Sequence, residues 1–400
     1  MKMLTIYYYS KHYYLERKFF NMAIKLNLNE KKEEKVNNNE DIKSLYRQNM
    51  SIDDLLIFTT EHNCSDLYIK VFEQPYISRY GKIIKVPCQP ITKDTWAKFY
   101  DSYILNELNA GYVRQKLLDT SVSIRVPEDS PNYGKYLNNC YRYRVSFGFS
   151  EERNIATFRM IKPEMPTFDT INYNQTCVEA LKVAYAKPSG IIYTTGPTGS
   201  GKSTTMAACI NTFTQPSNIL DNKVLITLED PIENVFECTD SVKINQKELG
   251  KDFISFDMGI KASLREHPNM IIVGECRDKE VICAAIEAAR TGHICSTTFH
   301  ASDVGGTINR LLYHLDNDRN LSMDLILQLN IVLSQKMIKQ DNGYLVDTQF
   351  LLFDDEVTKR LVEIIELPDA NIAVEINKLI ADERLQAKGV VKDWDYKELH

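Results

Sequence analysis

The sequence has 400 residues, of which 44% are hydrophobic, and its 48 basic and 54 acidic side chains give a formal net charge of −6. This length allows two or three domains, each with a hydrophobic core. The slight acidic excess disfavours direct binding to nucleic acid, which usually requires a basic face. No stretch contains the roughly 20 apolar residues that a membrane-spanning helix needs. We expect a cytosolic chain that contacts a membrane at most peripherally.

Residues 1–49 are predicted to form a partly disordered extension. The segment from Asn27 to Asp41 holds five asparagines and eight charged residues, and therefore too few apolar side chains to form a core. Residues 1–20 contain clustered tyrosines, but neither the continuous apolar stretch nor the cleavage site of a signal peptide. The tyrosines could pack as a short amphipathic element or contact a partner, or the segment could be a loosely ordered tail.

Nine cysteines are scattered between Cys64 and Cys295, and none forms a Cys-x-x-Cys pair. Their number is odd, and several lie in apolar runs. These features favour buried free thiols in a reducing compartment over a disulfide framework or a zinc site.

An N-terminal α+β domain is predicted over residues 50–165. Ser51 can cap a short helix that carries Asp54 in its first turn. Strand-like segments follow, the second of which turns at Gly81. These segments are residues 66–72, 77–86, 142–147 and 155–161. A linker with two prolines, at residues 163–170, ends the domain.

Residues 170–320 alternate between short apolar strands and helices, which predicts an α/β domain with a parallel sheet covered on both faces. The strand-like runs are Gly190–Thr195, Val224–Leu228, Met270–Val273 and Ile294–Thr298. From Ser322 onward, leucine and isoleucine recur about every 3.6 residues, so a mainly helical region is expected over residues 321–400. A hairpin or strand is expected within it, around Tyr344–Phe353.

The segment from Gly196 to Ser203 matches the phosphate-binding pattern G-x-x-x-x-G-K-[ST]. A predicted strand precedes it and a predicted helix, Lys202–Thr212, follows it. The glycines allow backbone N–H groups to surround phosphates, Lys202 can reach the β- and γ-phosphates of ATP, and Ser203 can bind Mg²⁺. The residues expected to bind ATP here are Gly196, Thr198, Gly199, Ser200, Gly201, Lys202, Ser203 and Thr204.

Acidic residues follow two of the predicted strands, at the sheet edge where ligands bind in such folds. Glu229 and Asp230 come directly after one strand. Either could orient the attacking water, hold Mg²⁺ through water, or cap the next segment. We predict a catalytic role for Glu229 and a metal-binding role for Asp230. Glu233 is as consistent with an ordinary surface acid as with a site residue.

Glu275 follows another strand, after an intervening Gly274. A glutamate reaches one methylene further than the aspartate that most such enzymes carry directly after this strand, which suits a general base acting on water. Arg277 is expected to pair with a nearby acid. Asp278 is expected to cap the following helix rather than to act in catalysis.

His300 ends the third apolar strand of this region. Although a lone histidine is more often an ordinary polar residue, its position at a strand end predicts a sensor of the γ-phosphate. His293 lies at the opposite end of the same strand, where a site role is less favoured.

Four motifs in this order resemble the Walker A, Asp box, atypical Walker B and His box of the PilT-like ATPases, a superfamily that includes type II and type IV secretion motors. They are GPTGSGKST from Gly196, ITLEDPIE from Ile226, NMIIVGECRD from Asn269 and TGHICSTTFHA from Thr291. Two N-terminal segments, residues 65–69 and 141–145, also resemble this family, with Tyr68 where histidine is usual. The resemblance extends from about Ser51 to at least Phe353.

The resemblance implies a homohexameric ring. Each subunit would have a PAS-like N-terminal domain and a RecA-like ATPase domain with ATP bound between them. In such rings, arginines of the N-terminal domain approach the phosphates, and Arg144, Arg153 and Arg159 are the matching candidates. We predict that Arg144 and Arg159 contact ATP, where a guanidinium would stabilise charge on the transferring phosphoryl group. Surface ion pairing is the alternative for each.

Within the superfamily, the sequence looks most like the DotB branch, whose ATPases serve type IVB secretion and related conjugation systems. It lacks a clear counterpart of the C-terminal motif of pilus-retraction ATPases and the cysteine pairs of the type II branch. The predicted function is a hexameric ATPase that powers such an apparatus and docks on its inner-membrane or coupling components. The alternatives are a type IV pilus retraction motor, a RecA-type nucleic-acid translocase, and a scaffold that binds ATP with negligible turnover.

Overall fold

A computed structural model describes residues 48–103, 118–161, 164–340, 343–366 and 371–395. The predicted extension, residues 1–49, therefore lies almost entirely outside the described residues. The chain divides into two compact units, Met1–Trp96 and Ala97–His400. The predicted domain limits at residues 50–165, 170–320 and 321–400 remain predictions.

The first unit contains the predicted short helix, α3 (Ile52–Glu61). Its start is fixed by a reciprocal pair of hydrogen bonds, as a capping box requires. The Asp54 N–H donates to Ser51 Oγ over 3.1 Å, and the Ser51 N–H donates to Asp54 Oδ2 over 2.9 Å. Three antiparallel strands follow, with Gly81 at φ +75° in the predicted turn between the last two. They are β1 (Asp66–Lys70), β2 (Tyr76–Arg79) and β3 (Lys82–Lys85).

An antiparallel meander opens the second unit. Its last two strands confirm the predicted strand-like runs, whereas the first strand and the helix before it were not predicted. Phe158 packs edge-on against Phe99 and Phe147 beneath the meander. The elements are α4 (Lys93–Tyr103), β4 (Leu118–Arg125), the 3₁₀ turn η1 (Leu137–Asn139), β5 (Cys140–Ser150) and β6 (Arg153–Ile161).

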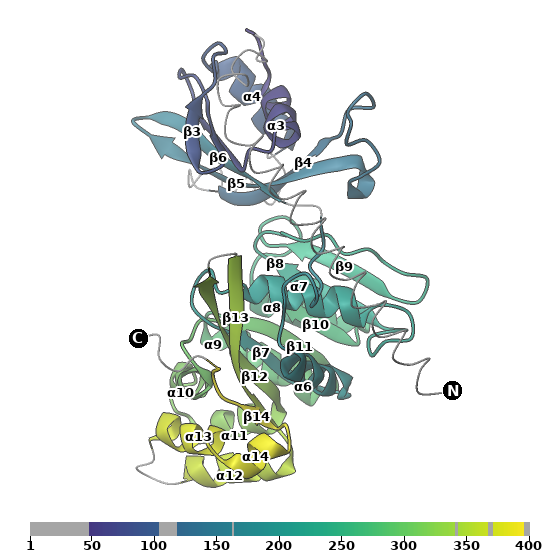
Figure 1. Cartoon of the computed structure of the whole chain (residues 1–400), viewed down its shortest axis with the longest axis vertical. Coiled ribbons are helices and arrows are strands. Elements are labelled where there is room, and N and C mark those ends of the chain that lie inside the picture. The colour runs from purple at the N-terminus through teal and green to yellow at the C-terminus, as the bar shows by residue number, and fades with distance from the viewer. Residues whose placement is uncertain (1–47, 104–117, 162–163, 341–342, 367–370, 396–400) are drawn as a thin grey trace, which may run out of the picture. The chain divides into compact units, whose positions relative to one another are not determined.

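The centre of the second unit is an eight-stranded sheet in the order β14-β13-β12-β7-β11-β10-β8-β9 (Figure 1). The strands from β12 to β9 in this order are parallel, and they include all four strands predicted for this region. Only β9 was missed. The bounds are β7 (Gly190–Thr195), β8 (Val224–Glu229), β9 (Lys243–Glu248), β10 (Met270–Val273) and β11 (Ile294–Phe299).

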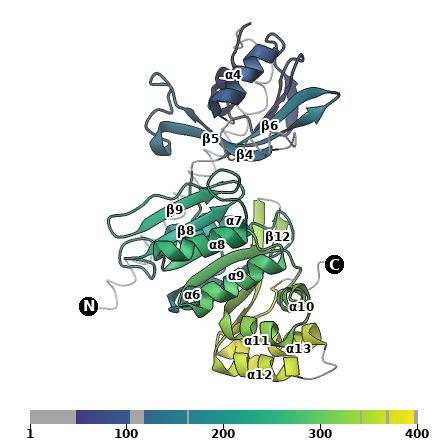
Figure 2. The same ribbon diagram turned by 180° about the vertical axis from the view of Figure 1, so that it is seen from behind.

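Helices cover both faces of this sheet, as predicted. The helices α6 and α7 lie on the face turned to the viewer in Figure 1, and α8 and α9 lie on the opposite face in Figure 2. The predicted cap of α9 is present, because Asp278 Oδ1 accepts a hydrogen bond of 3.0 Å from the Val281 N–H. The bounds are α6 (Gln175–Ala186), α7 (Lys202–Phe213), α8 (Phe256–Ser263), the 3₁₀ turn η2 (Leu264–Glu266) and α9 (Lys279–Arg290).

The C-terminal region is less helical than predicted. The expectation of helix is wrong for β12 (Leu329–Gln340), which pairs with β7 and forms a hairpin with β13 (Gly343–Leu352). Ile331, Val332 and Leu333 are all fully buried, and a continuous apolar run of this kind does not distinguish a buried strand from a helix. The remaining elements are α10 (Val304–His314), α11 (Arg319–Gln328), α12 (Asp355–Glu366), α13 (Ile372–Ile380), α14 (Glu383–Ala387) and β14 (Val391–Lys392).

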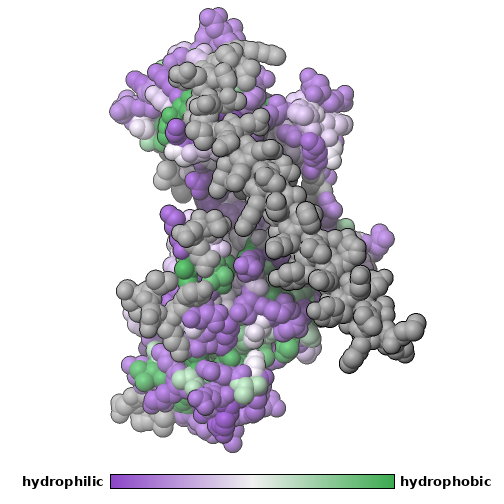
Figure 3. Space-filling model, in the orientation of Figure 1, coloured by the Kyte–Doolittle hydropathy of each residue, from purple (hydrophilic) through white to green (hydrophobic). Residues whose placement is uncertain are grey.

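The face of the molecule in Figure 3 is mainly hydrophilic, with hydrophobic residues in separate patches. Across the described ranges, none of the helices combines the length and the apolar character that a membrane crossing requires. All nine cysteines lie within these ranges as free thiols, and six of them are buried. Burial raises the pKa of the Cys177 thiol to about 11, which disfavours the reactive thiolate.

The cap of α9 gives a first testable prediction. Asp278→Ala removes the acceptor for the Val281 N–H, so we expect a loss of about 1 kcal/mol in the free energy of unfolding. Urea denaturation followed by circular dichroism, at fixed protein concentration, measures this loss. Asp278→Asn keeps an oxygen acceptor and is the matched control. Equal midpoints for the alanine variant and the wild type would contradict the assignment.

Candidate nucleotide-binding site

The phosphate loop runs from the end of β7 to the first turn of α7. At Gly196 the chain has φ +149°, and a Cβ atom there would lie only 2.4 Å from the carbonyl oxygen of Gln335. Only glycine tolerates both the backbone conformation and this close approach. Gly201, at φ +86°, precedes the helix and leaves the N–H groups of its first turn without a side-chain cap. These groups are available to an anion.

Lys202 is folded back onto its own loop. Its Nζ donates hydrogen bonds of 3.0 Å to the carbonyl oxygens of Gly196 and Pro197. Burial lowers the pKa of the Lys202 ammonium, and the Glu275 carboxylate acts in the opposite direction. A bound phosphate would therefore compete with two neutral carbonyl groups for the protons of this ammonium.

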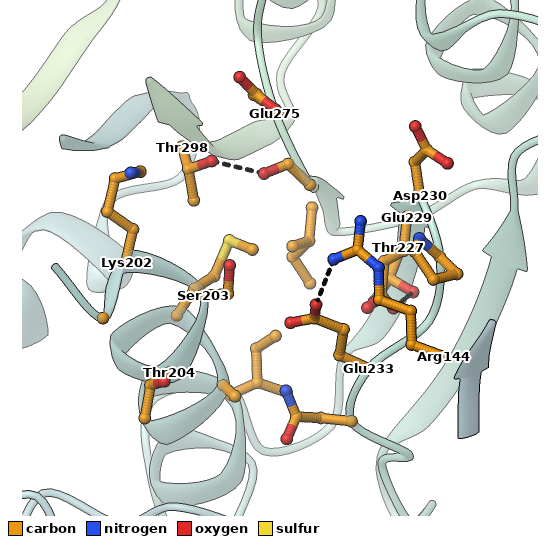
Figure 4. A pocket seen from close by; sticks show the side chains of 18 of the residues that line it. Arg144, Lys202, Ser203, Thr204, Thr227, Glu229, Asp230, Glu233, Glu275 and Thr298 are labelled. Carbon is orange, nitrogen blue, oxygen red and sulfur yellow. Dashed lines mark hydrogen bonds and ion pairs between the residues drawn. The ribbon is translucent and has the colours of Figure 1, made fainter. Parts of the chain in front are cut away.

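The loop lines a cavity of about 610 Å³ that also exposes the carboxyl ends of β8, β10 and β11 (Figure 4). Most residues of the predicted phosphate-binding set face this cavity: Thr198, Gly199, Gly201, Lys202, Ser203 and Thr204. Gly196 and Ser200 are buried behind it. The predicted acids Glu229, Asp230 and Glu275, together with His300, line the same cavity. The structure thus brings the predicted catalytic and phosphate-binding residues together.

Glu275 is held from two sides. Its Oε1 lies 3.1 Å from His300 Nε2, and its Oε2 accepts a hydrogen bond of 2.8 Å from Arg277 Nε. Burial is the main cause that lowers the pKa of His300, and the positive charge of Lys202 adds to it. A neutral His300 must then carry its proton on Nε2, because a carboxylate only accepts hydrogen bonds. This arrangement orients an ionised carboxylate, as a general base on water requires.

Glu229 is positioned by neighbours from two strands. Its Oε1 accepts hydrogen bonds of 2.6 Å from Thr227 Oγ1 and 2.9 Å from Gln246 Nε2. Burial raises the pKa of Glu229 to about 7, although these two hydrogen bonds lower it. Burial also raises the pKa of Asp230, against the positive charge of Arg277. The neighbours of Glu229 and Asp230 therefore offset only part of the effect of burial on their negative charge. This favours the approach of a cation.

The predicted arginines differ in position. Arg144 and Arg159 are opposite each other on β5 and β6, and both line the cavity. Arg144 forms ion pairs of 2.8 Å with Asp119 and 3.0 Å with Glu233, and the hydrogen bond to Asp119 is the main cause that raises its pKa. Glu233 also lines the cavity (Figure 4). The sequence analysis had left a site role for this residue open. Arg153 begins β6 and is not among the lining residues.

His293 is also outside the cavity, since its ring lies 3.2 Å from the Ala288 carbonyl oxygen at the other end of β11. Thr227 and Gln246, which bind Glu229, were not predicted. Thr227 belongs to a buried strand whose pattern looks purely structural, and Gln246 lies on β9, which was not predicted. The apolar wall of the cavity was also missed. It consists of Met206, Ala207, Ile210, Pro231, Phe236, Phe256, Ile272 and Met337.

Comparison with known proteins identifies the family of this chain. The protein family described as "Type II/IV secretion system protein" matches residues 50–358. The chain belongs to this family. It is therefore related to the PilT-like ATPases, as the four sequence motifs indicated, with the DotB branch among its near neighbours.

Two relatives define the likeness further. The type IV pilus retraction ATPase PilT of Pseudomonas aeruginosa is 31% identical over 317 residues, which is 78% of this chain and 85% of PilT. The crystal structure of the ATPase DotB of Legionella pneumophila has 27% identity and a TM-score of 0.72, covering 87% of this chain and 95% of DotB. A PilT structure with bound ADP has 25% identity and a TM-score of 0.68, covering 86% and 95% respectively.

The oxygen donors of the cavity fit Mg²⁺ bound together with a nucleotide. Among the described residues, no group of three histidine, cysteine or acidic side chains could by itself hold a metal ion. Ser203 supplies a hydroxyl oxygen at the phosphate loop, and Asp230 supplies a carboxylate on the same cavity. Mg²⁺ is typically bound by one or two such protein oxygens together with phosphates and water.

The buried state of Glu229 gives a second prediction. Because its pKa is raised from 4.5 to about 7, folding disfavours its charged form. The resulting loss of unfolding free energy is absent below pH 4.5, grows as the pH rises to about 7, and stays constant at higher pH. Relative to Glu229→Gln, we expect the wild type to lose up to about 3 kcal/mol of unfolding free energy across this window. Denaturant titrations of both proteins at several pH values measure the difference, and a constant difference would refute the assignment.

Proposed function

We propose that the protein is an ATP hydrolase that requires Mg²⁺. The observation that carries this proposal is that Lys202 of the phosphate loop and Glu275, held between His300 and Arg277, line one cavity. One element would bind the phosphates and the other would activate the attacking water. Membership of the family and the ADP-bound PilT structure support a nucleotide as the ligand.

The phosphate loop and the acids that line the cavity have separate roles in the proposed mechanism. The loop amides and Lys202 would bind the β- and γ-phosphates, while Ser203, assisted by Asp230 through water, would hold Mg²⁺. When bound there, Mg²⁺ would supply positive charge that offsets the charge of the phosphates. Glu275 accepts a proton from the attacking water, and Glu229 orients that water. The presence of each of these side chains on the cavity supports these assignments.

Three further side chains would interact with the transferring phosphoryl group, either by sensing its presence or by stabilising its charge. His300 lies within hydrogen-bond reach of Glu275 and would respond to the presence of the γ-phosphate. Arg144 and Arg159 would stabilise negative charge that develops during transfer. Arg144 is bound to Glu233 and Asp119, so contact with a phosphate would exchange one anionic partner for another.

For the biological role, we propose a homohexamer of subunits with a PAS-like N-terminal domain and a RecA-like ATPase domain. Its hydrolysis cycle would power a type IVB or conjugation-like secretion apparatus from the cytoplasmic side, through inner-membrane or coupling components and without direct contact to nucleic acid. The likeness to DotB supports this role. Loss of substrate export in a deletion strain tests it, and mass photometry with Mg²⁺-ATP tests the ring.

A type IV pilus retraction motor is the second candidate, favoured by the 31% identity to PilT. Both candidates have the same enzymatic class and differ in the machine they drive. Loss of twitching motility with intact export would favour retraction. ATPase stimulation by single-stranded DNA, with a steep dependence on salt, would instead indicate a nucleic-acid translocase.

The proposed chemistry predicts different effects for two substitutions. Glu275→Gln removes the base but leaves the phosphate loop intact, so kcat should fall about 10²- to 10⁴-fold while Mg²⁺-ATP still binds. Lys202→Ala should weaken binding itself. Phosphate release and calorimetric titration with Mg²⁺-ATP measure the two effects.

Glu280→Gln is the matched control for these measurements, since Glu280 is an exposed acid in the first turn of α9 and does not line the cavity. It should retain wild-type turnover. If Glu275→Gln hydrolysed ATP at the wild-type rate, or if it supported export while Lys202→Ala did not, hydrolysis through Glu275 would not be the mechanism.

A further inference from the structure

Gln335 is a fully buried amide on β12, the strand that pairs in parallel with β7. The register places Ser334 opposite Thr195, the last residue of β7, so Gln335 lies beside the start of the phosphate loop. The backbone carbonyl oxygen of Gln335 is the atom that a Cβ atom built on Gly196 would meet at 2.4 Å. A buried amide is unfavourable unless both of its ends are hydrogen-bonded, so the partners of this side chain indicate its role.

Both ends of the Gln335 amide have partners. Nε2 donates a hydrogen bond of 2.7 Å to the Ser200 carbonyl oxygen, and Oε1 accepts one of 3.1 Å from the Tyr173 hydroxyl. The carbonyl can only accept, so the amide nitrogen must face Ser200. Burial raises the pKa of Tyr173 well above its usual value, so the phenol keeps its proton and remains a donor. The amide thus has a single orientation.

This hydrogen bond also determines where the next N–H points. In a trans peptide unit the C=O and the N–H point in opposite directions. The carbonyl of Ser200 is bound from the buried side by Gln335, which is not among the residues that line the cavity. Gly201 and Lys202 do line it. The N–H of Gly201 is therefore turned toward the cavity, where a phosphate would accept its hydrogen bond.

We propose that Gln335 is a positioning residue for phosphate binding, and that Tyr173 holds its amide in the required orientation. The proposal rests on the proposed function, because it assumes that the loop binds the phosphates of ATP. Gln335 touches neither the nucleotide nor the reacting atoms. Its hydrogen bond fixes the orientation of the peptide between Ser200 and Gly201 before the nucleotide binds. Less conformational entropy of this peptide is then lost on binding.

The test measures the Kd of Mg²⁺-ADP by calorimetry, and kcat and KM for Mg²⁺-ATP, on full-length variants. Gln335→Met keeps the size of the side chain and removes both hydrogen bonds. Gln335→Glu places an acceptor against the Ser200 carbonyl oxygen. For both variants we expect Kd and KM to rise about ten- to hundredfold, with a smaller change in kcat.

Gln349 provides a matched control on the adjacent strand. It is also a buried glutamine with both ends bound, donating to Asp393 Oδ1 over 2.9 Å and accepting from the Val304 N–H over 3.0 Å. It lies opposite Ser334 and contacts no residue of the phosphate loop through these bonds. Gln349→Met should lower the thermal unfolding temperature as Gln335→Met does, but leave the Kd for Mg²⁺-ADP unchanged.

Tyr173→Phe provides a milder test if the Gln335 variants fail to fold. It removes only the hydroxyl that orients the amide, so we expect a two- to tenfold weaker Kd. An unchanged Kd in Tyr173→Phe or Gln335→Met would overturn the proposal, as would equal losses of affinity in Gln335→Met and Gln349→Met. A wild type that bound Mg²⁺-ADP without hydrolysing ATP would refute the proposed function while leaving this test valid.

Discussion

The parallel register of β7, β11, β10 and β8 brings the phosphate loop, Glu229, Glu275 and His300 to one edge of the sheet. Val273 is opposite both Leu228 and Thr297, so these strands end at the same level. Gly274 continues β10 by one residue, donating its N–H to the Leu228 carbonyl oxygen and accepting from Thr298 Oγ1. Since side chains alternate along a strand, this extra residue moves the following acid, Glu275, to the side where Lys202 and His300 lie.

Ion pairs compensate some of the charges on the cavity, whereas others have neutral or incomplete partners. Glu275 is compensated by Arg277, and Arg144 by Asp119 and Glu233, while the Lys202 ammonium is bound to neutral carbonyl groups. Glu229 and Asp230 retain raised pKa values because burial exceeds the compensation they receive. A negatively charged phosphate chain with its cation would bind here by exchanging partners with these side chains.

Sequence reasoning predicted the features that are encoded locally. The phosphate loop, the capped start of α9 and the strand before Glu275 each follow from adjacent residues. It failed where a partner lies far along the chain. The strand β4 was hidden because its buried Thr120 and Ser121 are polar, and both bind the carboxylate of Glu248. The strand β12 was read as helix because both of its faces are covered, and the roles of Arg144 and Arg159 remain predictions.

The pairing of β12 with β7 has a consequence for synthesis of the protein. Gln335 is 135 residues downstream of Ser200, whose carbonyl group it binds. At a translation rate of about 5 to 20 residues per second, a nascent chain carries a phosphate loop without this support for roughly 7 to 27 s. The ability to bind nucleotide tightly would then arise late in biosynthesis, after the central strands have formed, and a subunit truncated before β12 would lack it.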